Sequence, residues 1–136
     1  MRNYENYALG KWINGDGEGT PLYNAISGDQ IGTATSKGLD FSEIMHYARK
    51  IGGPSLRKMT FQERGLMLKK LALHLHSIKE KFYPASFQTG ATKIDSWIDI
   101  EGGIGNLFTN ASLRRQFPDL PYHIDGDMAP LSKNGT

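Results

Sequence analysis

The sequence predicts an α+β segment that is mainly helical and has a β-hairpin region at its N-terminus. Apolar residues recur at helical spacing, three and four residues apart, through most of residues 39–116. Before them, glycine-containing turns separate short stretches of strand-forming residues. We therefore expect a β-hairpin region over residues 1–38, helices over residues 39–116 and a loop region over residues 117–136.

The composition excludes several classes of function. The chain has 136 residues, with 16 Lys+Arg and 14 Asp+Glu, and no basic cluster that predicts a nucleic-acid partner. The absence of cysteine excludes disulfides, thiolate metal sites and a cysteine nucleophile within this chain. The N-terminus is polar and no apolar run is long enough to span a membrane, so we expect a soluble, cytoplasmic protein without a membrane partner.

Three short strands are expected in the N-terminal region. The first is Tyr7–Ile13, followed by a turn over Asn14–Gly19, where Asn-Gly and Asp-Gly pairs supply positive-φ positions. Pro21–Ile26 and Gln30–Thr35 are the other two strands, joined by a tight turn at Ser27–Asp29. So few short strands are not stable alone, so they must pack on the helices or on another chain.

The first helix is predicted from its N-cap. Asp40 and Glu43 have the spacing of a capping box, and the helical pattern continues to about Lys50. Gly52–Pro54 is expected to stop this helix.

Thr60 and Glu63 form a second predicted capping box, which opens the clearest helix of the chain. Its core face is predicted by five apolar residues that step by three and four: Leu68, Leu71, Leu75, Ile78 and Phe82. The same stripe would form a coiled-coil seam only with a partner helix.

A further helix is expected after a bend. Ser77 and Glu80 have the spacing of a new cap, and this helix should end near Thr89–Gly90. Pro84 lies within it and should kink it unless the bend is already there.

The stretch from Gln88 to Gln116 contains the predicted central helix. Thr92 is its expected N-cap, with Asp95 at the third helical position, and its apolar residues are Ile94, Trp97, Ile98, Ile104, Leu107, Phe108 and Ala111. Gly102, Gly103 and Gly105 interrupt it, each at a cost of about 0.5–1 kcal/mol relative to alanine. The sequence leaves two interpretations open: helix packing or a local break at these glycines, or a surface that a ligand approaches.

The C-terminal region is expected to be irregular. Phe117–Pro121 is a proline-bounded loop, and Tyr122–Thr136 reads as a loop or short strand with Asp-Gly and Asn-Gly turns. Asp125 and Asp127 resemble the start of a calcium loop, but its glycine and closing glutamate are missing from their positions.

No metal site and no catalytic residue are predicted. His74 and His76 are two residues apart on a helix, so they point to different faces and cannot share an ion. Asp95, Asp99 and Glu101 crowd the start of the central helix, where its positive end favours carboxylates.

Taken in order, these pieces resemble the N-terminal part of the aldehyde dehydrogenase superfamily. The segment NAISGDQI, the helices that start at Phe41, Phe61 and Ser77, the helix end Gln88–Gly90 and the string IDGD at Ile124–Asp127 all correspond to features of that family. One branch is more similar: MTFQERGLMLK, QTGATKIDSWIDIEGGIGNLFTNASL and PLSKNG resemble the dehydrogenase part of the bifunctional ring-opening proteins of phenylacetate degradation. The resemblance covers nearly all 136 residues.

The resemblance implies a fragment of the α/β aldehyde dehydrogenase fold, with the helical lobe over 39–116 and the start of an oligomerisation strand within 117–136. The parent would use NAD or NADP to oxidise an aldehyde through a cysteine nucleophile. The family's catalytic cysteine, glutamate, asparagine and dinucleotide-binding strands lie beyond Thr136, so this segment is expected to bind no cofactor and to be inactive alone. Pro84 stands where relatives usually have a helix former.

The resemblance also implies partners and a site. The expected partners are the remainder of the dehydrogenase chain, further copies in a homo-oligomer, and a CoA-linked semialdehyde substrate of the parent. In the family, the central helix lines the substrate tunnel, so Ile98, Gly102 and Gly105 would face it, with glycine widening its mouth. Packing of the helix on a neighbour remains the alternative.

A different class of function also fits the sequence. The chain could be a stand-alone helical assembly module without catalysis, whose stripe from Leu68 to Phe82 is partly exposed and buries itself in an oligomer. A free-standing small enzyme has the least support, because the sequence offers no nucleophile, metal ligand set or cofactor fingerprint.

Overall fold

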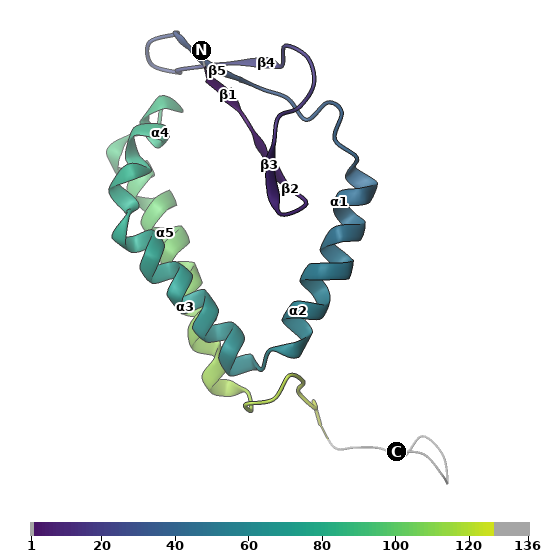
Figure 1. Ribbon diagram of the computed structural model, residues 1–136. Coiled ribbons are helices and arrows are strands. Elements are labelled where there is room, and N and C mark those ends of the chain that lie inside the picture. Colours follow the sequence, from purple (N-terminus) through teal and green to yellow (C-terminus); the bar gives the residue numbers. More distant parts are fainter. Residues whose placement is uncertain (1, 127–136) are drawn as a thin grey trace.

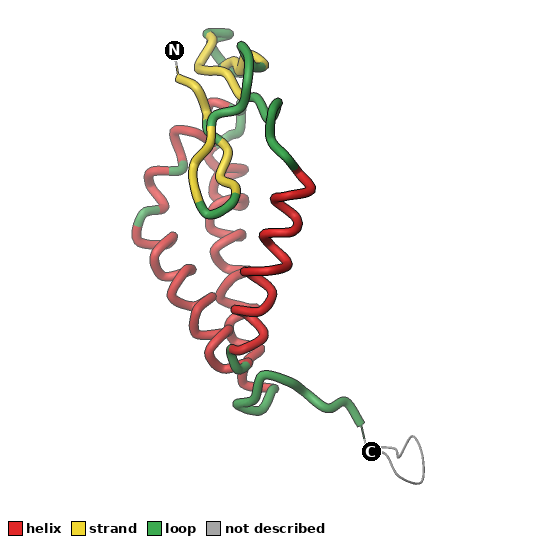
Figure 2. The backbone as a smooth tube through the Cα atoms, turned by 45° about the vertical axis from the view of Figure 1, so that its right-hand side comes forward, coloured by secondary structure: helices red, strands yellow, loops and turns green. Residues whose placement is uncertain are grey.

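The computed structural model describes residues 2–126, which form an open V (Figure 1). One arm is a helical rod, made of α1 (Phe41–Tyr47), the π-helical turn η1 (Ala48–Gly52) and α2 (Gly53–Lys58). The other arm is dominated by α3 (Phe61–Ser77) and α5 (Lys93–Ser112). The strands gather at the open end of the V, and the C-terminal segment leaves from the closed end (Figure 2).

Five short strands form two small sheets. β1 (Arg2–Tyr4), β5 (Gln30–Ala34) and β4 (Thr20–Tyr23) lie in the order β1-β5-β4, with β1 parallel and β4 antiparallel to β5. β2 (Asn6–Ala8) and β3 (Lys11–Ile13) form a separate antiparallel pair.

The predicted strand Tyr7–Ile13 is wrong, because the chain reverses in its middle. Leu9 and Gly10 have φ angles of 55° and 79°, which close β2 and β3 into a tight hairpin. This places Tyr7 opposite Trp12, with their rings edge to face at 5.2 Å. A leucine in the left-handed region is uncommon, so Gly10 is the one usual turn residue at this position.

The other two predicted strands are confirmed in part. Gln30–Thr35 corresponds to β5, and Pro21–Ile26 corresponds to β4 over its first residues. The second strand ends early because the Asn24 side chain accepts a hydrogen bond from the Ile26 backbone N–H at 2.9 Å.

The predicted stop at Gly52–Pro54 is also wrong. The Asp40 carboxylate caps α1 by accepting from the Glu43 N–H at 2.9 Å, but the chain then continues through η1 into α2. Pro54 lies in the first turn of α2, where a missing N–H costs little. The Ser55 hydroxyl donates to the Ile51 carbonyl at 2.7 Å, which satisfies an acceptor at this junction.

The second capping box and the bend are confirmed. Thr60 and Glu63 exchange both hydrogen bonds of the capping box at the start of α3. After α3 come the short turn η2 (Lys79–Lys81) and α4 (Tyr83–Gln88), with Pro84 in the first turn of α4. The bend therefore precedes the proline and no helix is kinked by it. The expected cap at Ser77 is wrong, since its hydroxyl donates to the His74 carbonyl.

The central helix forms as predicted and is α5. Thr92 and Asp95 complete a capping box, and the preceding turn ends at Gly90 with a φ of 87°. The helix is continuous through its three glycines and ends in the short turn η3 (Leu113–Gln116).

The core lies where α3 and α5 cross in opposite directions. Ala72, Ile104 and Ala111 are buried there. A Cβ built on Gly65 would lie 2.7 Å from the Arg114 Cβ and 2.9 Å from the Ala111 carbonyl oxygen, so only glycine allows this approach. The predicted core stripe is wrong in part: Leu71 and Phe82 are exposed, while the smaller Gly65 and Ala72 are buried.

The C-terminal segment folds back onto the start of α3. The Phe61 N–H donates to the Leu120 carbonyl at 3.0 Å, and the Phe61 and Phe117 rings stack at 4.6 Å. The Gln62 side chain donates to the carbonyl of Arg114 at 2.7 Å. The predicted loop Phe117–Pro121 is confirmed. Tyr122–Asp125 forms no strand, and Gly126 of the expected Asp-Gly turn has a φ of 84°. The expected Asn-Gly turn at Asn134–Gly135 and the remainder of the predicted loop or strand lie outside the described residues.

Many large apolar side chains remain uncovered. The chain exposes 10527 Å², against about 7,000 Å² for a folded monomer of 15.1 kDa. Large apolar side chains are exposed on both arms, among them Met45, Ile51 and Leu56 on the rod and Leu66 and Leu73 on α3. No described helix has the length and apolar character needed to cross a membrane.

The glycines differ in their expected cost of substitution. Gly65→Ala should destabilise the chain by about 1–3 kcal/mol, because the new Cβ overpacks against the Ala111 backbone. Gly102→Ala has open space around it and should stabilise by about 0.5–1 kcal/mol through helix propensity. Urea unfolding followed by circular dichroism measures both midpoints. Equal midpoints for the two variants would contradict the close approach at Gly65.

Candidate functional site

The predicted tunnel residues lie together on one face of α5. Ile98, Gly102 and Gly105 fall within an arc of about 60° at 3.6 residues per turn. Ile98 is 54% exposed, and both glycines are exposed. They form a strip of low relief, which we call the glycine strip (Ile98, Gly102 and Gly105).

Within residues 2–126, the three glycines of α5 are explained neither by close helix packing nor by a break in the helix. No described atom outside α5's own adjacent backbone lies within 4 Å of a Cβ built at Gly102, Gly103 or Gly105. The helix does not break there, and its packing on α3 uses Ile104 and Ala111 instead. The glycine strip is therefore an open surface of the described chain.

The N-terminal half of α5 adds apolar surface beside the glycine strip. Ile94 is 71% exposed and Trp97 is 55% exposed. By contrast, Ser96 on the opposite side is fully buried and accepts a hydrogen bond from the Ser86 hydroxyl at 2.8 Å. This half of α5 is thus fastened on one side and uncovered on the other.

A shallow apolar recess lies between α5 and the end of α3. Its volume is about 280 Å³, and its walls are Leu75, Phe82, Ile100, Gly103 and Ile104. A residue larger than glycine at position 103 would fill part of this space. The side chains here leave α5 incompletely packed.

A polar cluster stands next to the recess and joins three elements. The Lys79 ammonium on η2 donates to the Glu101 Oε1 on α5 at 2.6 Å. The Tyr83 hydroxyl at the start of α4 donates to the same oxygen at 3.4 Å. The Lys79 and Glu101 side chains are only 24% and 25% exposed, so the pair is partly shielded from water.

Each member of the cluster has a shifted pKa. The hydrogen bond from Lys79 holds the pKa of Glu101 below its usual value, and the hydrogen bond to Glu101 raises the pKa of Lys79. Burial, and then the nearby Glu101 charge, raises the pKa of the Tyr83 hydroxyl. The cluster is therefore ionised as a Lys⁺–Glu⁻ pair at neutral pH, with Tyr83 as a neutral donor.

The pKa shifts predict how stability depends on pH. Because the pKa of Glu101 is lowered on folding, its contribution is present above the ordinary carboxyl pKa and is lost as pH falls through the folded value. Because the pKa of Lys79 is raised, its contribution is present below the ordinary lysine pKa and is lost as pH rises through the folded value.

Glu101→Gln should accordingly melt at a lower temperature than the wild-type chain at pH 7, with the gap closing below about pH 4. Thermal melts of both chains from pH 3 to pH 8 measure this gap. A gap that is constant over the range would mean that the Glu101 charge does not contribute through the ion pair.

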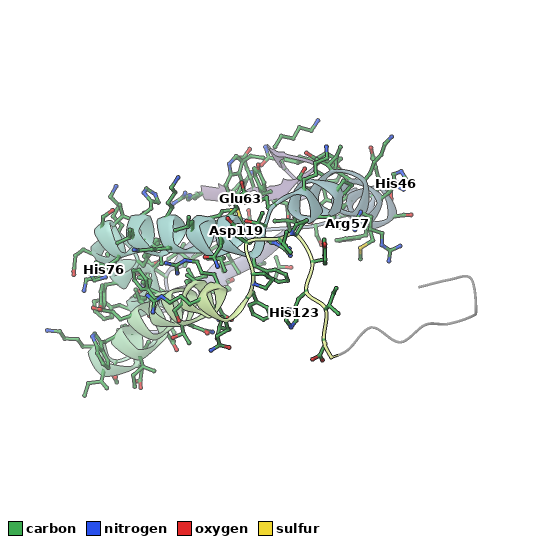
Figure 3. The ribbon with its side chains drawn as sticks, turned by 90° about the horizontal axis from the view of Figure 1, so that it is seen from below. His46, Arg57, Glu63, His76, Asp119 and His123 are labelled. Carbon is green, nitrogen blue, oxygen red and sulfur yellow. The ribbon has the colours of Figure 1, made fainter. Side chains whose placement is uncertain are left out.

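The described residues offer no metal centre and no paired catalytic carboxylates. No group of three or more potential metal ligands comes together within residues 2–126. His74 and His76 are exposed as predicted, and Figure 3 shows His46, His76 and His123 far apart on separate elements. Asp95 bonds Thr92 and Glu101 bonds Lys79, so these two carboxylates serve a helix cap and an ion pair.

The described strands do not fit a dinucleotide site. β1 and β5 are parallel neighbours, but the chain between them runs through strands and turns, without a crossover helix. The expectation that this segment binds no nicotinamide cofactor remains a prediction.

Sequence reasoning missed the Lys79–Glu101–Tyr83 cluster. Its members come from three elements, and no periodicity or motif links them. The only signal was Glu101 itself, a charged residue next to the apolar face of the central helix.

Comparison with known proteins shows what this chain is similar to. No protein-family model matches this sequence. Over 100 residues, the chain is 33% identical to a curated protein named as a dehydrogenase. The predicted resemblance to a segment of an aldehyde dehydrogenase is thereby confirmed.

The particular relative is the 3,4-dehydroadipyl-CoA semialdehyde dehydrogenase of Aromatoleum evansii. The match covers 73% of this chain and 19% of the relative, so the chain spans less than a fifth of that protein's length. This match supports a function related to that of aldehyde dehydrogenases.

Proposed function

We propose that this chain is the N-terminal part of an NAD(P)-dependent semialdehyde dehydrogenase of aromatic catabolism. The observation that carries the proposal is the 33% identity to a CoA-linked semialdehyde dehydrogenase over 73% of this chain. The segment would contribute scaffold, subunit contact and one wall of the substrate entrance. The cysteine nucleophile and the nicotinamide site would come from the remainder of the dehydrogenase chain.

The uncovered surface supports this proposal. A chain that exposes 10527 Å² and carries large apolar side chains on both arms of the V needs further protein to cover them. The arms themselves share few contacts, and the strands are too short to be stable alone. These are the properties of a lobe that packs against other domains.

The substrate of the relative supports a role for the glycine strip. Its name specifies a CoA-linked semialdehyde, which is a bulky substrate. A helix face with glycine at positions 102 and 105 leaves room that larger side chains would occupy. We therefore assign Ile98, Gly102 and Gly105 to the wall of the substrate entrance. The proposal also places the parent dehydrogenase in phenylacetate degradation.

Gly102→Met in the full-length dehydrogenase tests this assignment. The added side chain should narrow the entrance, so we expect KM for a CoA-linked semialdehyde to rise about tenfold. KM for a small aldehyde and both kcat values should change much less. Gly102→Ala is the matched control, because it keeps the helix and adds one carbon only. Unchanged KM values for both aldehydes in Gly102→Met would show that the glycine strip does not line the entrance.

The native polypeptide tests the proposal as a whole. An antibody raised to residues 61–112 should detect a polypeptide several times larger than 15.1 kDa in its source cells. That polypeptide should reduce NAD or NADP in the presence of a CoA-linked semialdehyde. A native mass near 15.1 kDa without dehydrogenase activity would exclude the proposal.

The exposed apolar residues of α3, which include Leu71 of the predicted stripe, favour a second candidate function, the stand-alone assembly module. Leu66, Met67, Leu71 and Leu73 are all exposed, as expected of a surface that becomes buried in an oligomer. A module should be monodisperse in solution and unfold cooperatively at 15.1 kDa. A lobe of a larger enzyme should aggregate at high concentration and lose its helical signal gradually. Its midpoints are then those at which half of the helical signal is lost in dilute solution.

A further inference from the structure

The N-terminal half of α5 lacks the apolar packing that fixes its C-terminal half. Ile104 and Ala111 are buried against α3, whereas Ile94, Trp97 and Ile98 are exposed. Between these halves, the apolar recess of about 280 Å³ leaves space beside Ile100 and Gly103. Apolar contact is non-directional, so such loose packing allows a helix to rotate about its axis.

Polar contacts hold α5 in this stretch instead. Glu101 receives the hydrogen bonds of Lys79 at 2.6 Å and Tyr83 at 3.4 Å, and Ser96 receives that of Ser86 at 2.8 Å. Hydrogen bonds require a defined distance and angle, and a charge-assisted bond to a carboxylate is the strongest of them. These contacts therefore specify the rotation of α5 where apolar packing does not.

Lys79 and Tyr83 lie at the bend between α3 and α4. Lys79 begins η2 and Tyr83 begins α4, so they flank the bend between α3 and α4. Pro84 follows Tyr83 directly, and its ring fixes the backbone φ angle there. The position of this bend therefore determines where Lys79 and Tyr83 bind Glu101.

Glu101 is adjacent to the glycine strip on the helix surface. At 100° per residue, it lies about 60° from Ile98 and about 40° from Gly105. A rotation of the N-terminal half of α5 that Glu101 prevents would turn Ile98 and Gly102 by the same angle, whereas Gly105 follows the packed Ile104. The position of the carboxylate thus determines where the strip faces.

We propose that Lys79, Glu101 and Tyr83 form a positioning cluster that fixes the rotation of α5 and thereby the direction of the glycine strip. The inference rests on the proposed function, in which the strip lines the substrate entrance. Lys79, Glu101 and Tyr83 touch no substrate in this assignment. They act on substrate selection by holding the helix that carries the strip.

The test uses the full-length dehydrogenase with Lys79→Met and Glu101→Gln. Each should raise KM for a CoA-linked semialdehyde relative to KM for a small aldehyde by about threefold or more, with kcat changed less than about twofold. The exchanged pair, Lys79→Glu with Glu101→Lys, should bring the KM ratio back to within about twofold of the wild type. Tyr83→Phe should have a smaller effect, because the ion pair remains.

Lys81→Met is the matched control. Lys81 is on the same turn and is exposed, and its side chain has no hydrogen bond or ion pair within the described residues. It should leave the KM ratio unchanged. A ratio that moves equally in Lys81→Met, or stays constant in both Lys79→Met and Glu101→Gln, would overturn the positioning role.

Amide hydrogen exchange separates this inference from the proposed function. In Lys79→Met and Glu101→Gln, amides from Ile98 to Gly105 should exchange faster than in the wild type and in Lys81→Met. If the wild-type protein oxidises no aldehyde, the proposed function fails while exchange still decides whether the cluster holds α5. Unchanged exchange in both variants would refute the positioning cluster even in an active dehydrogenase.

Discussion

The crossing of α3 on α5 is the contact on which the rest of this structure depends. It contains three of the four buried apolar residues of the described chain, Ala72, Ile104 and Ala111. Two of these are alanines, and Gly65 lies at the closest point. Small residues let the two backbones approach, but they bury little apolar area. The C-terminal segment fastens to the same place through Phe61 and Gln62. The arm is therefore closely packed where α3 begins and α5 ends. At its other end, polar contacts hold the two helices.

The other end of this arm is held by charge and hydrogen bonds. Lys79 and Glu101 are partly shielded from water, so solvent screens their attraction less than that of a fully exposed pair. The shifted pKa values of both groups have the same origin, because each stabilises the ionised form of the other. The apolar recess next to the pair explains why a polar anchor is needed there. Apolar packing therefore holds the C-terminal half of α5, and polar contacts hold its N-terminal half.

Local chemistry explains which parts of the fold could be predicted from the sequence. The caps at Thr60 and Thr92 were predictable because a capping box involves residues only three positions apart. The hairpin at Leu9 was not, because a leucine rarely takes a positive φ. The continuous path through Pro54 was not, because Gly52–Pro54 has the residues that usually stop a helix, yet the chain continues into α2. The apolar period located the helices correctly, but it could not distinguish the buried Ala72 from the exposed Leu71.

The same limit applies to the candidate site. Glycine signals close approach in general, and the sequence directed attention to Gly102, Gly103 and Gly105. Among the helical glycines, the close approach occurs at Gly65, whose neighbours are Ala111 at the end of α5 and Arg114 on η3. Likewise, the Lys79–Glu101 pair forms only once the bend has brought η2 to α5. Both contacts are tertiary, so a single sequence contains no local signal for them.

The open glycine strip and the uncovered arms have one physical explanation. A helix that carries three glycines loses stability at each of them, and no atom of the described chain outside α5's own adjacent backbone occupies the space they leave. The excess surface shows that the described chain does not cover its own apolar side chains. Under the proposed function, protein of the remainder of a dehydrogenase would cover the arms, and the strip would face the space through which a bulky substrate passes. The cost of the glycines is then offset by packing that the larger assembly provides.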